Sequence, residues 1–295
     1  MAEAPKGQIG LGTYRGGEDD ADDDRMCEVL RYAFERGIRI VDTAVTYRAG
    51  RSEVVVGRAV VEAIRRGVVR RDDLEVWSKG GFVRPSASAL RTPPAPEAHE
   101  PRDHCLRPAC LRYHLELSLM TLGLETIDVW YLHNPEEAAS RARRDEFHAL
   151  MRTAFQTVEQ AVSEGLIRSY GIATWTGGSP HSAWSIRELK ALARDVAETS
   201  FGRLDRLTHV QAPLSLTNRE ALIPARDGSG TSCVGMCQSL GLHFAASASA
   251  GSGRIPALAV TSVGWVRHLP GVGTALVGTL AKAHLEPLLD DGQGR

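Results

Sequence analysis

Short apolar runs alternate along this chain with longer segments in which apolar residues recur at helical spacing. Runs at 38–41, 74–79 and 127–133 are typical of buried strands, and further candidates lie at 169–173, 209–212, 243–247 and 274–278. Between them, helical spacing is clearest over 147–162, and helices also fit 183–197, 232–240 and 257–268. Glycines follow several of these segments, where helices commonly end. The pattern predicts repeated strand–helix units.

Such units imply a parallel sheet covered by helices. About eight of them run along the chain without a linker, which favours a closed (β/α)8 TIM barrel over an open doubly wound sheet. The glycine-rich segment 10–17 is not followed at once by a helix, and this argues against a dinucleotide-binding fingerprint. We therefore predict a single α/β barrel domain over residues 1–295.

Two segments interrupt the alternation. Residues 80–107 form a long stretch rich in proline, alanine, serine and histidine after the third strand. We predict a long loop over the barrel mouth, either a substrate-facing lid or an insertion without function. An acidic run at 19–24 is most simply a solvated helix entry.

Composition removes several classes of partner. The chain has 295 residues, and 35 basic side chains against 36 acidic ones give a net charge of -1. No strong field is available to attract nucleic acid or anionic lipid. No apolar run approaches the roughly 20 residues of a membrane helix, and the N-terminus lacks a signal-peptide pattern. We expect a cytoplasmic protein with neither a nucleic-acid nor a membrane partner.

Five cysteines are scattered along the chain, and we expect them to be reduced thiols. The alternative is a metal site formed by His104, Cys105, Cys110 and His114. Their spacing does not match the common paired-cysteine zinc patterns, so we predict no metal site.

Polar residues end three of the predicted strands. These are Asp42, Lys79 and His133. Each alone has a structural explanation, as a turn cap, a solvated cation or a hydrogen-bonded core histidine. Because the carboxyl ends of barrel strands meet at one face, the three side chains together indicate a site there.

The same segments resemble the aldo-keto reductase family. The resemblance is carried by GIRIVDTAVTY with Asp42 and Tyr47, by VWSKGG with Lys79, and by SLMTLGLETIDVWYLHNPE with His133; EGLIRSYGIATW, VQAPLSLTNRE and TALVGT are weaker matches. It implies a catalytic set of Asp42, Tyr47, Lys79 and His133. It also implies a β-hairpin before the barrel in many members, for which MAEAPKGQ is too short, so we expect little or no hairpin here.

The chemistry of that set can be argued from its side chains. Reduction of a carbonyl by hydride needs a proton donor at the oxygen, and Tyr47 can serve. The Lys79 ammonium is expected to lower the tyrosine pKa, and Asp42 to hold Lys79 in place. A neutral His133 would donate a hydrogen bond to the carbonyl oxygen and orient the substrate.

Hydride chemistry also requires a carrier. The resemblance implies a nicotinamide dinucleotide, with NADP(H) favoured and NAD(H) possible. It places cofactor contacts at strand ends, at Gly12, Thr13, Tyr14, Thr174, Gln211, Ser247, Ser249, Gly251, Gly278, Thr279 and Lys282. Two positions depart from the family, since Trp175 replaces a common asparagine and Ala246 replaces an aromatic residue.

The sequence thus predicts an NAD(P)H-dependent oxidoreductase acting on a small carbonyl or alcohol. A relative with non-redox acid–base activity or a nucleotide-binding regulatory role is the alternative that Trp175 and Ala246 favour. A metal-dependent barrel hydrolase fits less well, because only Asp42 and His133 offer ligands at strand ends. Substrate identity, reaction direction and oligomeric state are left open by these residues.

Overall fold

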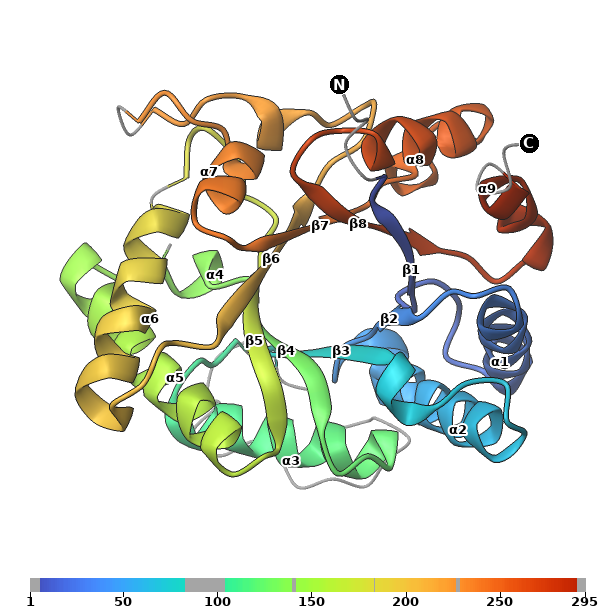
Figure 1. Ribbon diagram of the computed structural model, residues 1–295, viewed down its shortest axis with the longest axis horizontal. Helices are drawn as coiled ribbons and strands as arrows, with labels where there is room; N and C mark the ends of the chain where they lie inside the picture. The colour runs from blue at the N-terminus through green and yellow to red at the C-terminus, as the bar shows by residue number, and fades with distance from the viewer. Residues whose placement is uncertain (1–5, 83–103, 140–141, 183, 227–228, 291–295) are drawn as a thin grey trace.

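Eight parallel strands close into a barrel, which confirms the predicted (β/α)8 fold (Figure 1). The computed structural model describes residues 6–82, 104–139, 142–182, 184–226 and 229–290. Each strand pairs with the next along the chain, and β1 pairs with β8 to close the ring. The strands are β1 Gln8–Gly12, β2 Ile40–Asp42, β3 Glu75–Gly80, β4 Ile127–His133, β5 Ile167–Ala173, β6 Leu207–Pro213, β7 His243–Ser247 and β8 Val272–Gly278.

Helices surround the strands as an outer ring (Figure 1). The longer ones are α1 Asp20–Glu35, α2 Arg51–Arg65, α3 Pro108–Leu122, α5 Arg144–Ser163, α6 Ile186–Phe201, α7 Cys233–Ser239 and α8 Ala259–Arg267. Short elements complete the set, namely α4 Glu136–Ala139, α9 Glu286–Asp290, and the 3₁₀ turns η1 Tyr47–Gly50, η2 Arg71–Asp73, η3 Glu220–Leu222, η4 Gly251–Gly253, η5 Pro256–Leu258 and η6 Lys282–His284. None of the described helices is long and apolar enough to cross a membrane.

Two apolar layers stabilise the barrel, one between strands and helices and one inside the ring of strands. The inner layer consists of large and small side chains from several strands, Ile40, Trp77, Val129, Tyr131, Ala173, Ala245 and Leu276. Small residues make room for the large ones: a Cβ at Gly10 would lie 2.7 Å from the Leu276 side chain. The barrel is therefore a packed core, with a site possible only at its ends.

The predicted interruptions have different outcomes. Of the long stretch 80–107, residues 83–103 lie outside the described part of the chain, as do residues 1–5, so the hairpin expectation stays a prediction. The acidic run is not simply solvated, because Asp22 is buried and Asp23 forms an ion pair with both Arg48 and Arg51. The reason is that α1 packs against α2 and η1, which bring arginines to its first turn.

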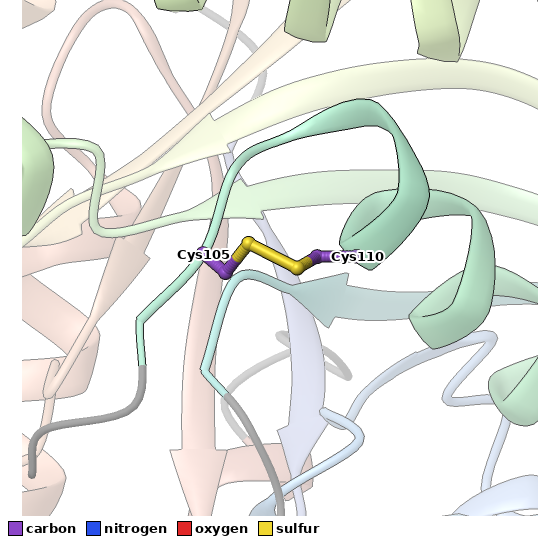
Figure 2. Close-up of a disulfide and its surroundings, with 2 residues drawn as sticks. All are labelled: Cys105 and Cys110. Atoms are coloured by element: carbon purple, nitrogen blue, oxygen red, sulfur yellow. A yellow bond between two sulfur atoms is a disulfide. The ribbon is translucent and has the colours of Figure 1, made fainter. Parts of the chain in front are cut away.

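The prediction of reduced cysteines is wrong for one pair. Cys105 and Cys110 form a disulfide whose Cα atoms lie 6.0 Å apart (Figure 2). The bond links the segment that enters α3 to the first turn of that helix. The spacing of the two cysteines alone did not indicate this pairing. It also removes the hypothetical metal site, since the two sulfurs bind each other. Cys27, Cys233 and Cys237 are free and buried, and the residues with described coordinates contain no cluster of three metal-binding side chains.

Candidate active site at the carboxyl ends of the strands

The three predicted strand-end residues lie at one end of the barrel. Asp42 is the last residue of β2, Lys79 is next to last in β3, and His133 is the last residue of β4. Their exposed fractions are 4%, 0% and 9%. Tyr47 begins the turn η1 after β2 and is half-buried beside them. The structure thus brings the four side chains together.

Lys79 is bound on several sides. Its Nζ donates to both carboxylate oxygens of Asp42 at 2.7 Å and to the Thr43 carbonyl at 2.8 Å. The Gln211 side-chain amide donates to the same carboxylate at 2.8 Å. Burial would lower the pKa of Lys79, but Asp42 and Tyr47 outweigh it and the pKa is raised. Lys79 is therefore an ammonium at neutral pH.

Tyr47 lies next to this ammonium, with the Lys79 Nζ 4.7 Å from its ring centroid. The expectation of a lowered pKa is wrong for the protein as it stands. Burial raises the pKa of Tyr47 more than Lys79 lowers it, and Asp42 raises it further. Tyr47 consequently keeps its proton at neutral pH and can act as a donor.

His133 is a neutral base in this environment. Burial, then Lys79, then His104 hold its pKa well below the usual range. Its ring meets the Tyr47 ring edge-on, with centroids 6.1 Å apart. The neutral state expected from the sequence is thus explained by burial beside a cation, and a neutral imidazole carries one N–H donor.

The turn that carries Tyr47 is strained and anchored. Arg48 and Ala49 have φ values of 51° and 52°, a left-handed conformation that side chains disfavour. The Arg48 guanidinium is buried and donates to the Gly17 carbonyl at 2.7 Å and to Asp23 at 2.6 Å. The acidic first turn of α1 therefore holds the turn on which Tyr47 sits.

The predicted cofactor residues at and just after the end of β1 lie beside Asp42 and Tyr47. Gly12 lies in register with Asp42 on one side and Gly278 on the other. Thr13 is buried, and its N–H and hydroxyl both donate to the Asp42 carbonyl, at 3.0 and 3.1 Å. Tyr14 is 68% exposed, and its ring meets Tyr47 edge-on at 5.1 Å.

The loop after β5 is held by a residue that sequence reasoning missed. Glu136 accepts bonds from the Thr174 hydroxyl at 2.8 Å and from the Trp175 N–H at 2.6 Å. The Thr174 oxygen also accepts the Gly177 N–H. Thr174 is thus already bonded within the loop, while Trp175 is 57% exposed and Ala246 is fully buried. The sequence signal for this role of Glu136 was its position three residues after the strand-end histidine.

The loop after β7 contains a run of left-handed residues. Ala248, Gly251, Ser252 and Gly253 all have positive φ. Ser247 is half-buried at its start, whereas Ser249 is buried and donates to the Leu276 carbonyl at 2.6 Å. Successive N–H groups in such a run can form a concave anion-binding nest.

Arg15 is a second residue that sequence reasoning missed. Its guanidinium donates to the Ser252 carbonyl at 2.6 Å, so it crosses from the loop after β1 to the loop after β7. A Cβ at Gly278 would lie 3.2 Å from its side chain. An arginine shortly after a glycine-rich strand was the only signal in the sequence.

The remaining predicted contacts follow β8 and are bonded to neighbours. The Thr279 hydroxyl lies 2.8 Å from the His284 ring nitrogen. Lys282 is half-exposed and lies 3.3 Å from Glu28 of α1. Both therefore already have partners within this chain.

Comparison with known proteins agrees with this arrangement. The model of the Aldo/keto reductase family matches residues 8–257. Aldo-keto reductase AKR2E4 of Bombyx mori is 30% identical over 57% of this chain and 46% of its own length. D-threo-aldose 1-dehydrogenase of a Pseudomonas species is 30% identical over 52% of this chain and 44% of its own length. The chain spans about half the length of the curated relatives that it matches.

A solved structure shares the fold. The aldo-keto reductase from Klebsiella pneumoniae in complex with NADPH superposes with a TM-score of 0.65 and 20% identity, covering 98% of this chain and 89% of that one. The family model extends from β1 to the turn after β7, and it includes every residue of the Asp42, Tyr47, Lys79 and His133 cluster. The chain belongs to the aldo/keto reductase family.

Proposed function

We propose that this chain is an NADP(H)-dependent oxidoreductase that transfers hydride between nicotinamide and a carbonyl or alcohol substrate. The observation that carries the proposal is geometric: the buried Lys79 Nζ, bonded to Asp42 at 2.7 Å, lies 4.7 Å from the centroid of the Tyr47 ring. The relatives support it, since they include an aldose dehydrogenase and an NADPH-dependent aldose reductase of Saccharomyces cerevisiae. The expected cytoplasmic location stays a prediction.

Each residue of the cluster has one task in this mechanism. A reduced nicotinamide, when bound at the mouth, would supply the hydride for the carbonyl carbon. Tyr47 gives its proton to the carbonyl oxygen as negative charge develops there. Lys79 stabilises the phenolate that Tyr47 becomes, and Asp42 holds the ammonium in place. His133 donates its single N–H toward the same oxygen, and Tyr47 regains a proton from water.

The residues of the mouth fit a dinucleotide. The left-handed run after β7 offers backbone N–H groups, and Arg15 places a cation beside it. Gly278 and Gly253 keep this corner open, since a Cβ at either would approach the Arg15 side chain. A diphosphate has the charge that this corner can hold.

The choice between NADP(H) and NAD(H) depends on Lys282. Its ammonium is half-exposed and can bind a 2′-phosphate as a point charge, although Glu28 competes for it at 3.3 Å. We propose NADP(H), which is also the ligand of the Klebsiella pneumoniae structure.

The primary test measures NADPH oxidation with a panel of aromatic and aliphatic aldehydes. Turnover by the wild type is expected, and Tyr47→Phe should lower kcat by about 10²–10⁴-fold, because it removes the proton donor and leaves the ring in place. NADPH binding, followed by tryptophan fluorescence, should be nearly unchanged in this variant. Tight NADPH binding without turnover of any carbonyl would reject the redox assignment.

A second test concerns the anion corner. Arg15→Met should weaken NADPH binding about tenfold, with a smaller salt dependence, because one cation near the diphosphate is lost. Arg152→Met is the matched control, since Arg152 is an exposed arginine of α5 paired with Asp195. Equal affinities for the two variants would remove Arg15 from the cofactor site.

A second function is favoured by the loop after β5. Thr174 is bonded to Glu136, and Ala246 offers no ring to stack on nicotinamide. These features favour a nucleotide-binding relative with non-redox acid–base chemistry or a regulatory role. This second function predicts that the protein binds NADPH saturably and that carbonyl compounds do not oxidise the bound NADPH.

A further inference from the structure

The chain leaves β3 and returns to α3 through two short segments that lie against each other. We call residues 80–82 and 104–106 the neck. Phe82 and His104 form an antiparallel bridge, and the Cys105 N–H donates to the Gly81 carbonyl at 2.7 Å. The Phe82 and His104 rings meet edge-on at 4.9 Å. The neck is therefore a defined structure beside the end of β4.

His104 contacts the main chain of His133 directly. Its Nε2 lies 2.7 Å from the His133 carbonyl oxygen. A carbonyl oxygen can only accept, so Nε2 of His104 carries the proton and donates it. Gly81 permits this approach, because a Cβ there would lie 2.8 Å from the same oxygen and 3.1 Å from the His104 nitrogen. Its φ of 145° is also one that glycine favours.

Phe82 contacts the His133 ring directly. The two rings meet at 87° with centroids 5.0 Å apart, and Tyr47 faces His133 at 6.1 Å. His133 is nine-tenths buried, so its ring orientation is set by these neighbours. The neck thus touches both the backbone and the imidazole of this residue.

The disulfide ties the neck to the start of α3. Cys105 follows His104 directly, and its bond to Cys110 reaches the first turn of α3 (Figure 2). Both cysteines are buried, and so is Leu106 between them. The bond restrains Cys105, the residue that directly follows His104.

We propose that His104 is a positioning residue for the reaction: together with Phe82 it holds His133 in the orientation that meets the substrate oxygen, and the Cys105–Cys110 disulfide holds His104. The inference rests on the proposed function. The His133 N–H that would donate to the substrate belongs to a residue whose backbone carbonyl and ring both contact the neck. The proposed cofactor corner around Arg15 is formed by other loops, those after β1 and β7.

The experiment compares His104→Leu, which removes the N–H donor, with His104→Gln, which keeps one. Steady-state rates are measured with NADPH and 4-nitrobenzaldehyde. We expect His104→Leu to lower kcat about fivefold, the equivalent of one ordinary hydrogen bond, with NADPH affinity unchanged. His104→Gln should recover most of the rate. The matched control is His268→Leu, because the exposed His268 also bonds a backbone carbonyl, that of Gly264, away from the site.

The disulfide is tested in the same assay. The Cys105→Ser, Cys110→Ser double variant should lose about threefold in kcat, again without loss of NADPH affinity. Dithiothreitol, which is oxidised to its cyclic disulfide as it converts the cystine to two thiols, should reproduce that loss in the wild type and have no effect on the double variant. Cys27→Ser, which removes a buried thiol of α1, should behave as the wild type.

Failure of this inference is distinguishable from failure of the proposed function. A wild type that turns over the aldehyde while His104→Leu matches it in kcat overturns the inference alone, as does a parallel loss of NADPH affinity. A wild type that reduces no carbonyl overturns the proposed function. In that case the imidazole ¹⁵N–¹H resonances of His133 test the positioning role by themselves. They should shift in His104→Leu and stay in place in His268→Leu, and unshifted resonances would reject that role.

Discussion

Two polar clusters of the barrel differ in whether a buried side chain keeps its charge. We call Asp42, Tyr47, Lys79 and His133 the upper cluster, and His209 with His243 the lower cluster. At the carboxyl ends of the strands, Lys79 keeps its proton although it is fully buried, because both carboxylate oxygens of Asp42 lie 2.7 Å from the ammonium. Nearer the amino ends of β6 and β7, the half-buried rings of His209 and His243 are tilted against each other with centroids 4.8 Å apart, beside Trp77. Their partners are the hydroxyls of neighbouring threonines.

The two histidines of the lower cluster are neutral because burial lowers their pKa values and no carboxylate among the described residues offsets it. Burial and the neighbouring His243 lower the pKa of His209 to about 3, and burial lowers the pKa of His243 as well. Both histidines are therefore neutral at pH 7. The comparison shows that a buried cation persists in this barrel where a carboxylate is built next to it, which is the condition that the proposed chemistry of Tyr47 needs.

The largest expected effect on stability comes from removing the Lys79 ammonium from the upper cluster. Lys79→Met should lower the free energy of unfolding by about 3–5 kcal/mol, because it leaves the Asp42 carboxylate buried without its cation. Urea denaturation followed by circular dichroism measures this. Gln211 still donates to Asp42 at 2.8 Å, but a neutral amide does not replace an ammonium.

The control for this substitution removes the second charge too. Asp42→Asn combined with Lys79→Met should recover a large part of the lost stability, since neither buried charge remains. If the double variant loses as much free energy of unfolding as the two single variants together, Asp42 and Lys79 do not act as a pair. The proposed difference between the two clusters would then be wrong.

Acidification should destabilise the lower cluster, and His133 of the upper cluster adds to the effect because its pKa is lowered as well. The pKa of His209 is about 3 in the folded chain and about 6.5 when unfolded, so between these values the unfolded state binds the extra proton. Stability should therefore be flat above about pH 6.5 and fall below it, by up to about 1.4 kcal/mol per pH unit for each histidine. Urea midpoints measured from pH 8 to pH 4.5 test this, and His209→Phe should reduce the slope, with the contributions of His243 and His133 remaining. An unchanged slope in that variant would assign the acid sensitivity elsewhere.

Much of the upper cluster could be predicted from the sequence, and the lower one could not. Apolar runs locate strand ends, and parallel strands bring Asp42, Lys79 and His133 to one level without any knowledge of distances. The direction in which His209 points was not readable, since a histidine inside a strand can face the helices or the barrel interior. Its neutral state follows only from the packing of Trp77 and His243 around it.

The wrong or missed predictions at the barrel mouth also concern properties that depend on packing in three dimensions. The pKa of Tyr47 was expected to fall because its cation could be predicted, but the depth of burial that raises it could not. The pairing of Cys105 with Cys110 depends on the path by which the neck returns to α3, and the spacing of the two residues does not predict that path. Glu136 binds the loop after β5 because α4 turns back toward it.

The smallest effect separates hydrogen bonding from titration in the lower cluster. The Thr274 hydroxyl lies 2.9 Å from a ring nitrogen of His243, and Thr208 makes a similar contact of 2.7 Å with His209. Thr274→Val preserves the shape and removes the hydroxyl, so stability should fall by about 1 kcal/mol at every pH, with the slope below pH 6.5 retained. Thr208→Val is the matched variant for the other ring. A loss confined to acidic pH would mean that the hydroxyls act on protonation, and that the histidines are not kept neutral by burial alone.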